Sequence, residues 1–180
     1  MPTFIDVPGT HDFYAEIEWT AATGLLNGWA SGHFLPGHDI TRGAMSAVFY
    51  RLSGQPYYLP PTTSVFRDVL TGYDFFKEVH WVKERGLLNG WNDGMFRPES
   101  GITREATAAL VYRSAGSPDF QPPATSPFVD VPPRHVFYRE ICWMAAQGIT
   151  TGWSDKTFRP LNQTVRGDMA AFLHRFDRAV

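Results

Sequence analysis

Three arginines recur at a fixed spacing of 62 residues, as Arg42, Arg104 and Arg166, each expected in the first turn of a helix. That end of a helix is positive, so a cation there costs roughly 0.3–1 kcal/mol. A bound anion would offset this cost, because free backbone N–H groups and a guanidinium can both hold a carboxylate. Gly43 and Gly167 would let such a ligand approach the backbone closely. The pattern therefore predicts an anion-binding site that occurs three times.

Residues near these arginines are candidates for the same site. Thr41 and Thr103 immediately precede two of them, where a threonine can cap a helix and also offer its hydroxyl to a ligand. An indole ring provides a flat apolar face for stacking on a sugar, although burial in the core explains such a ring equally well. The three tryptophans concerned lie in equivalent loops: Trp29, Trp91 and Trp153.

A second interpretation of the arginines needs no ligand. Asp6, Asp68 and Asp130 repeat at the same spacing, and these or a glutamate of the preceding helix could form an intramolecular salt bridge with each guanidinium. We favour contact with a ligand, but both interpretations stay open on the residues alone.

The 62-residue spacing extends over the whole chain of 180 residues. A register this strict indicates one structural unit used three times. A catalytic centre is normally built once, whereas triplicated residues serve packing or a repeated site. The repeated positions include Phe4/Phe66/Phe128, Glu16/Glu78/Glu140, Trp19/Trp81/Trp143, Gly24/Gly86/Gly148 and Pro36/Pro98/Pro160.

Each unit is predicted to contain two helices joined by a tight loop. Apolar residues at helical spacing indicate a first helix that ends at Gly24, Gly86 or Gly148. The repeated tryptophan of this helix is expected to pack in the core or on a neighbouring unit. Asn-Gly pairs predict the loop turn, because both residues tolerate positive φ. The second helix is predicted to start near Thr41, near Thr103, and at Thr164 or Val165.

Two helices cannot bury enough apolar area alone, so the three units should share one core. The possible arrangements are a closed pseudo-threefold and a short solenoid. The predicted domain boundaries are repeat 1 at 1–53, a linker at 54–65, repeat 2 at 66–115, a linker at 116–127 and repeat 3 at 128–180. Proline pairs in both linkers favour extended, semi-rigid chain.

Composition excludes several classes of protein. A net charge of −2 without a basic run disfavours nucleic acid, and Cys142 alone cannot form a disulfide within the chain. No segment approaches a membrane-spanning length. The start, Met1-Pro2-Thr3-Phe4, lacks the features of a signal peptide. Because the repeats begin almost at Met1 and end almost at Val180, we expect a module excised from a longer protein, for which the missing signal says little. The triplicated carboxylates lack the asymmetry that separates acid from nucleophile, so we do not expect an enzyme.

The order Phe-x-Asp-Val, Gly-Leu-Leu-Asn-Gly-Trp, Asp-Gly-x-Phe-x-Pro and Ile-Thr-Arg resembles the S-layer homology repeat, most fully from Phe66 to Arg113. The resemblance implies an all-α, three-pronged spindle around a central helix bundle. It also implies a module that anchors bacterial surface proteins by binding secondary cell-wall polysaccharide in grooves between repeats. In that family the Arg of a Thr-Arg-Ala-Glu motif is central, and a pyruvate ketal can be recognised.

This chain departs from that motif. The arginine is present three times, but the glutamate is absent and Asp168 is its nearest substitute. The loop Asp-Gly is complete only at Asp93-Gly94, which makes Asp93 a further ligand-binding candidate. A calcium site at Asn92-Asp93-Gly94 would lack the necessary series of oxygen ligands. Because the second repeat departs least, Arg104 is expected to carry the strongest site, and Arg104→Ala to weaken binding more than Arg166→Ala.

We therefore expect a cell-surface module that binds an anionic, pyruvylated or otherwise acidic, wall polysaccharide. No cofactor, metal, nucleic acid or membrane insertion is implied. The alternative is a protein-interaction or self-assembly module whose partners are other S-layer protein chains.

Overall fold

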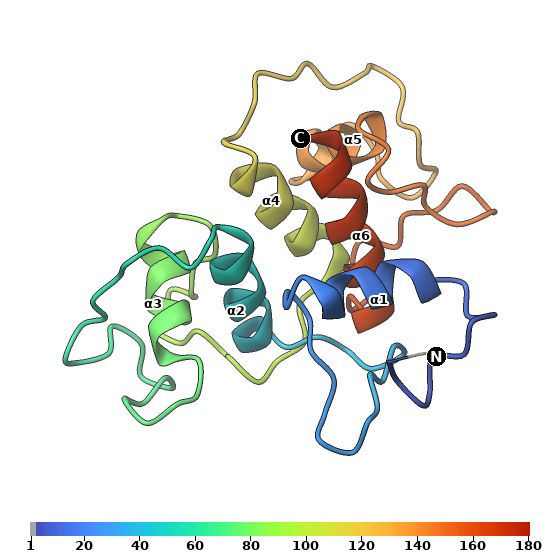
Figure 1. The fold of residues 1–180 in the computed structure, drawn as a ribbon. Coiled ribbons are helices and arrows are strands. Elements are labelled where there is room, and N and C mark those ends of the chain that lie inside the picture. Colours follow the sequence, from blue (N-terminus) through green and yellow to red (C-terminus); the bar gives the residue numbers. More distant parts are fainter. Residues whose placement is uncertain (1–2) are drawn as a thin grey trace. The chain divides into compact units, whose positions relative to one another are not determined.

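The computed structural model describes residues 3–180, so the interpretation of Met1 and Pro2 lies outside it. This part of the chain is helical and has isolated bridges in place of strands, which confirms the all-α prediction (Figure 1). None of its helices is long and apolar enough to cross a membrane. The six helices are α1 (Tyr14–Ala22), α2 (Arg42–Leu52), α3 (Phe76–Glu84), α4 (Arg104–Ser114), α5 (Tyr138–Ala146) and α6 (Arg166–Ala179).

The predicted helix ends are confirmed. Glycine adopts a left-handed conformation just after each first helix, where a side chain would be strained. The hydroxyl oxygen of Thr41 accepts the N–H of Ala44 at 3.2 Å, which caps α2. Thr103 caps α4 in the same way. The φ angles of these glycines are 72° at Gly24, 66° at Gly86 and 68° at Gly148.

The second helix of the third repeat, α6, differs at its start. It follows Val165, which has no side-chain group that could cap it. Thr164, the other predicted start, is instead fully buried, and its hydroxyl is hydrogen-bonded to that of Thr107 at 2.8 Å. No side chain therefore caps α6, because valine stands at the position that threonine has before α2 and α4.

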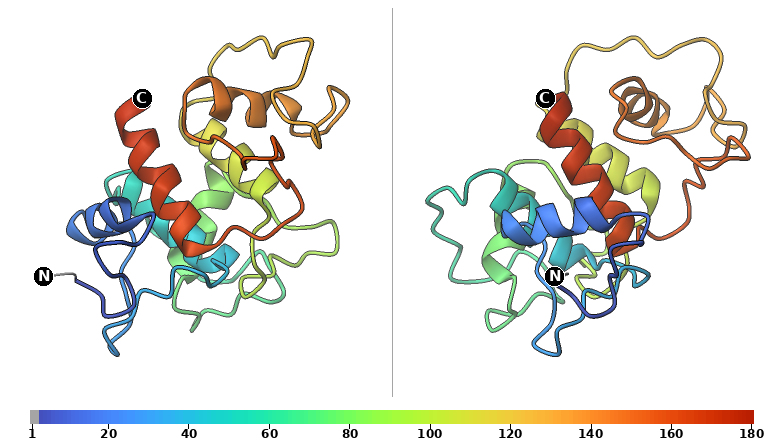
Figure 2. Two further views of the ribbon diagram at one scale, coloured as in Figure 1. Left: turned by 90° about the vertical axis from the view of Figure 1, so that its right-hand side faces the viewer. Right: turned by 45° about the vertical axis from the view of Figure 1, so that its right-hand side comes forward.

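The chain folds into two compact units whose boundaries cut across the sequence repeats. The smaller unit is Ile40–Ile102, and the larger combines the chain up to Asp39 with Thr103–Val180. Within the smaller unit α2 lies beside α3, and within the larger unit α1 lies beside α6 and α4 beside α5 (Figures 1 and 2). Each second helix therefore packs on the first helix of the following repeat, and α6 returns to α1.

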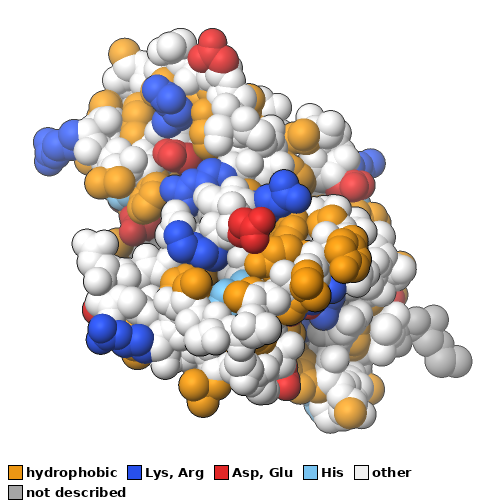
Figure 3. Space-filling view, turned by 90° about the vertical axis from the view of Figure 1, so that its left-hand side faces the viewer, with side chains coloured by type: hydrophobic (Ala, Val, Ile, Leu, Met, Phe, Trp, Pro, Cys, Tyr) orange, Lys and Arg blue, Asp and Glu red, His pale blue; other side chains and the backbone are white. Residues whose placement is uncertain are grey.

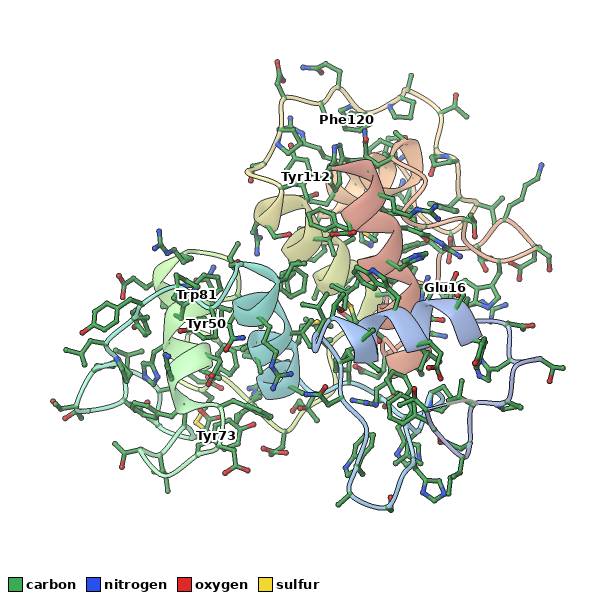
Figure 4. All side chains as sticks on the ribbon, in the orientation of Figure 1. Glu16, Tyr50, Tyr73, Trp81, Tyr112 and Phe120 are labelled. Carbon is green, nitrogen blue, oxygen red and sulfur yellow. The ribbon has the colours of Figure 1, made fainter. Side chains whose placement is uncertain are left out.

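Aromatic contacts fix these helix pairs. Tyr50 of α2 meets Trp81 of α3 edge to face, with ring centroids 5.2 Å apart (Figure 4). Tyr112 and Trp143 repeat this contact between α4 and α5 at 5.4 Å. Trp19 instead contacts His174, because histidine replaces the tyrosine on α6. Packing of the repeated tryptophan between neighbouring units is thereby confirmed.

Isolated bridges add to the helix contacts inside each compact unit. They join Thr41 to Gly101 and Thr103 to Gln163, and a third joins Asp39 to Val165. The choice between a closed pseudo-threefold and a short solenoid stays open. The three-pronged spindle itself stays a prediction.

Each loop is held by a carboxylate near the start of its own repeat. Asp6 accepts the N–H groups of Phe34 and Leu35 at 2.8 and 2.7 Å, although Leu35 has a left-handed φ of 58°. A left-handed backbone conformation is costly for a residue other than glycine, and it persists only where other contacts enforce it. The same pair of bonds recurs in the other repeats. Asp68 accepts the N–H groups of Phe96 and Arg97, and Asp130 accepts those of Phe158 and Arg159.

The Asn-Gly turns form for a different reason than predicted. Gly28 and Gly90 do not have positive φ. A Cβ at Gly28 would lie 2.3 Å from the ring of Phe4, and one at Gly90 would lie 2.5 Å from Phe66. Close approach of an aromatic ring and of a backbone carbonyl oxygen, 2.6 Å from such a Cβ at both positions, therefore requires glycine here, and not backbone handedness.

Candidate functional site

Each of the three arginines inserts into the loop of the following repeat. Their helix starts place them there, and they are almost fully buried, with exposed fractions of 5% for Arg42, 3% for Arg104 and 7% for Arg166. In each case Nε donates a hydrogen bond to a backbone carbonyl that the loop aspartate has positioned. The acceptors are Phe96 O at 2.9 Å for Arg42, Phe158 O at 2.9 Å for Arg104 and Phe34 O at 2.8 Å for Arg166.

The second bond of each guanidinium distinguishes the three sites. Arg42 donates from Nη2 to the carbonyl of Asn89 at 2.7 Å, and Arg166 donates to that of Asn27 at 2.8 Å. Arg104 instead donates from Nη1 to the carboxylate of Asp168. Among residues 3–180, Asp168 is the one carboxylate in ion-pair contact with any of the three.

Aromatic rings cover the flat faces of the guanidinium groups. The central carbon of Arg42 lies 4.3 Å from the centre of the Trp91 ring and 4.6 Å from that of Phe96. Arg104 and Arg166 are enclosed in the same way, by Trp153 with Phe158 and by Trp29 with Phe34. Attraction between a cation and a ring is worth about 2 kcal/mol or more when both are desolvated.

Two of the three tryptophans carry a second cation. Arg97 lies 4.4 Å from the centre of the Trp91 ring, and Arg159 lies 4.5 Å from that of Trp153. Each of these two rings therefore has two guanidinium groups within cation–π distance. The equivalent residue beside Trp29 is Leu35, which leaves Trp29 with a cation on one face.

The loop tryptophans are not core residues. Trp29 is 47% exposed and Trp91 is 42% exposed, and Trp153 is half-buried. The core interpretation of these rings was therefore wrong. Two arginines lie against Trp91 and against Trp153, whereas a single arginine lies against Trp29, so one face of the Trp29 ring carries no cation.

The helix N-termini do not offer free N–H groups to an anion, as the sequence had suggested. The backbone N–H of Arg42 donates to Ser100 O at 2.9 Å, and that of Gly43 donates to Pro98 O at 2.8 Å. The first two N–H groups of α4 and α6 bond in the same way to loop carbonyls of the following repeat. The loop backbone itself is thus the partner of each helix dipole.

The glycines after the arginines also serve internal packing. A Cβ at Gly43 would lie 2.0 Å from the hydroxyl of Tyr73, and one at Gly167 would lie 3.2–3.3 Å from Pro36 and Phe13. Atoms of this protein therefore occupy the space beside Gly43 and Gly167, which argues against the close approach of a ligand to the backbone there. Tyr73 lies in the segment before α3 (Figure 4).

The repeated aspartates are neither partners of the arginines nor paired catalytic carboxylates. Asp6, Asp68 and Asp130 accept loop N–H groups, as described above, and do not contact the guanidinium groups. Although burial acts to raise the pKa of Asp6, the N–H groups of Phe34 and Leu35 hold this pKa below its usual value. A carboxylate of this kind is a poor proton donor, which suits a structural role.

Asp93 likewise shapes its own loop. It accepts the N–H of Met95 at 3.0 Å and forms an ion pair with Arg97 at 2.8 Å. This pair directs Arg97 over Trp91. The charges on the surface remain mixed in sign. On the face drawn in Figure 3, basic and acidic side chains are interspersed with hydrophobic ones.

Burial lowers the pKa of each of the three guanidinium groups to about 10, so all three stay charged at neutral pH. Asp168 counteracts part of this effect at Arg104. At Arg166 the only opposing charge is that of Asp6, which is not in contact with it. Cations perturbed by burial without a carboxylate beside them are candidates for anion recognition.

A cavity of about 390 Å³ lies beside Arg104 in the larger compact unit. Its lining includes Trp153, Asp168 and Arg175, together with Phe13 from the first repeat. This volume lies within the range of about 300–1,000 Å³ that is usual for small-molecule sites.

Sequence reasoning found the arginines, the tryptophans and the capping threonines. It missed the carbonyl acceptors, because a backbone oxygen has no sequence signal. It also missed the second cations, although Arg97 and Arg159 are 62 residues apart and this spacing could have revealed them.

Comparison with known proteins agrees with these repeats. The S-layer homology domain family matches residues 3–46, 65–108 and 127–170. The chain is 27% identical over 141 residues to the cellulosome-anchoring protein of Acetivibrio thermocellus, which covers 77% of this chain and 31% of that protein. It is 30% identical over 95 residues to cell surface glycoprotein 1 of the same organism, which covers 52% of this chain and 4% of that protein. The chain therefore spans less than a third of either relative.

Proposed function

The chain belongs to the S-layer homology domain family, and on this basis we propose that it is a non-catalytic module that anchors a surface protein to the bacterial cell wall. Its ligand would be an acidic secondary wall polysaccharide, in which a pyruvate ketal is one possible source of the acid group. The printed names of the two relatives, one for anchoring and one for the cell surface, support this role.

The observation that carries the proposal is a buried guanidinium, held in place by loop carbonyls, that has no carboxylate of its own. Arg42 and Arg166 fit this description, and for both the Nη1 group has no hydrogen-bond partner among residues 3–180. A carboxylate placed there would receive a charge-assisted hydrogen bond from a group whose orientation is already fixed. Little conformational entropy would be lost on binding.

The Arg166 site is our first candidate for the acid group and its sugar. Trp29, beside Arg166, has one ring face without a cation and is 47% exposed, so the sugar could stack there. At Arg104 the carboxylate of Asp168 already takes the donor. We therefore rank Arg166 above Arg104, the reverse of the ranking from sequence. The hydroxyls of Thr41 and Thr103 would remain able to donate after capping their helices.

A pull-down tests the proposal. Purified protein should sediment with native bacterial sacculi and stay in solution with sacculi stripped of secondary polysaccharide. Arg166→Gln and Trp29→Ala should each lower retention, and Arg178→Gln, an exposed change on α6, should not. Equal retention on native and stripped sacculi would exclude polysaccharide recognition. Circular dichroism of each variant would show that it is folded.

A protein-interaction module is the second candidate, favoured by exposed apolar side chains in the first linker. Tyr57 is 93% exposed, and Leu59 and Val65 line a neighbouring cavity of about 360 Å³ in the smaller unit. Treating sacculi with protease separates the two functions. Loss of binding after proteolysis, with the polysaccharide intact, would support a protein partner.

A further inference from the structure

We propose that Asp168 determines the ligand chemistry of the Arg104 site: its carboxylate occupies the guanidinium, excludes acidic groups and leaves the adjoining cavity to an uncharged sugar unit. This inference rests on the proposed function, since it assigns different ligand chemistry to one of the three arginine sites.

The contact between the two side chains is largely withdrawn from water. The Arg104 side chain is 4% exposed and that of Asp168 is 20% exposed. Nε of Arg104 donates to Phe158 O, and Asp168 takes Nη1, the group that has no hydrogen-bond partner among residues 3–180 in Arg42 and Arg166. A charge-assisted hydrogen bond is roughly twice as strong as a neutral one, and an incoming carboxylate would have to displace it.

An acidic ligand would also meet the negative charge of Asp168 itself. Two carboxylates in one site repel each other, and one of them must then take up a proton. The nearby cation Arg175 also lines the cavity, and its Nη1 donates to Ile149 O at 3.3 Å. Burial raises the pKa of Asp168, and Arg104 and Arg175 counteract this rise.

An uncharged sugar has the opposite properties. Its hydroxyls both donate and accept hydrogen bonds, so they can bond to an ion pair without breaking it. The lining of the cavity of about 390 Å³ also includes Thr151 and Ser154, which carry hydroxyls of their own.

The sequence register shows that this arrangement is particular to one site. The residues that lie 62 and 124 positions before Asp168 are Ala106 and Ala44, neither of which can carry a charge. The structure accordingly contains an ion pair at Arg104 and carbonyl partners at Arg42 and Arg166.

The Nε–H groups of the three arginines allow each site to be observed separately. All three donate to backbone carbonyls at 2.8–2.9 Å, so their protons should exchange slowly and give resolved signals in nitrogen-15 NMR spectra. Sodium acetate serves as the carboxylate probe, with sodium chloride as the control for ionic strength. In the wild type the Arg104 signal should not respond to acetate. In Asp168→Asn it should, with a half-saturation concentration at least tenfold below the highest acetate concentration at which the wild type shows no response.

Two further variants make the result decisive. Asp168→Ala introduces the residue found at the equivalent positions and should behave like Asp168→Asn. Asp155→Asn removes an exposed carboxylate of the same loop and should leave the Arg104 signal unresponsive. An equal response of Arg104 to acetate in the wild type and in either Asp168 variant would overturn the inference.

Titration with solubilised wall polysaccharide then separates the inference from the function on which it rests. The signals of Arg42 and Arg166 should move in the wild type, and that of Arg104 should join them in Asp168→Asn. If the polymer moves none of the three signals while the acetate results hold, the proposed function fails and Asp168 still blocks the site. If Arg104 moves with the other two in the wild type, Asp168 does not exclude acidic groups.

Discussion

The Arg104 and Arg166 sites lie in the same compact unit and share one backbone plan, yet their surroundings differ in charge. In both, a loop aspartate aligns a carbonyl, the carbonyl accepts from Nε, and an indole covers the guanidinium. At Arg104 a carboxylate completes the pairing and a second arginine lies over the tryptophan. At Arg166 both additions are absent among the described residues. The fold thus fixes how the arginine is held, and a few side chains outside that framework decide what it can bind.

The largest predicted effect comes from breaking the ion pair. Arg104→Ala would remove a buried cation and leave the half-buried carboxylate of Asp168 without its ion-pair partner, so we expect the free energy of unfolding to fall by about 3 kcal/mol. The double variant Arg104→Ala/Asp168→Ala should recover part of this loss, because no uncompensated charge remains. Urea denaturation followed by circular dichroism measures both. A double variant no more stable than Arg104→Ala would show that Asp168 is not buried against this arginine.

Substitution of Asp6 should have the next largest effect on stability, because Asp6 binds the N–H of Phe34, and the carbonyl of Phe34 accepts the bond from Arg166. Asp6→Asn keeps the shape but removes the charge that accepts two N–H groups, so we expect a loss of about 1.5–3 kcal/mol. The sign with pH follows from the lowered pKa of Asp6. Its stabilisation is complete above the pKa of the unfolded chain, about 3.9, and is lost as pH falls through the lower folded value.

The acid limb of the stability curve checks this assignment. Below about pH 4 the wild type should lose stability more steeply than Asp6→Asn, since the variant has no carboxylate to protonate there. Parallel acid limbs would mean that Asp6 does not supply the stabilisation. Asp12→Asn, an exposed change in the same repeat, is the matched control.

Substitution of Trp29 and of Trp91 should weaken polysaccharide binding to different extents, because a second arginine lies against Trp91 and not against Trp29. Trp29→Ala removes a ring with an available face, and we expect weaker binding to wall polysaccharide by about 0.5–1.5 kcal/mol, roughly two- to tenfold. Trp91→Ala removes a ring that Arg42 and Arg97 cover, so its effect on sugar stacking should be smaller. Isothermal titration calorimetry with solubilised polymer measures the difference. Equal losses would contradict a special role for Trp29.

Much of the fold was accessible from the sequence because a fixed register multiplies each local signal by three. The glycine at the end of the first helix and the threonine caps at Thr41 and Thr103 were predictable, since each acts through its nearest neighbours. The partners of the arginines were not. Backbone carbonyls such as Phe34 O carry no sequence signature, and the pairing of Arg104 with Asp168 joins residues 64 positions apart. The reason for glycine at position 43 could not be predicted either, because the side chain that a Cβ would meet, that of Tyr73, belongs to the next repeat.

The smallest predicted effect comes from giving the Trp29 loop the arginine that the Trp91 and Trp153 loops already have. Leu35→Arg would place a guanidinium where Arg97 and Arg159 lie in the other repeats. The left-handed backbone accepts the change, because φ is 58° at Leu35 and 54° and 58° at the two arginines. We expect a gain of about 0.5–1 kcal/mol in stability from the new contact with Trp29. Binding of wall polysaccharide should fall by about as much as in Trp29→Ala, because the free ring face is covered. Leu35→Lys, which brings charge without a planar group, should lower binding less. Unchanged binding in Leu35→Arg, with tryptophan fluorescence showing that the new cation lies over the ring, would mean that the sugar does not use this face.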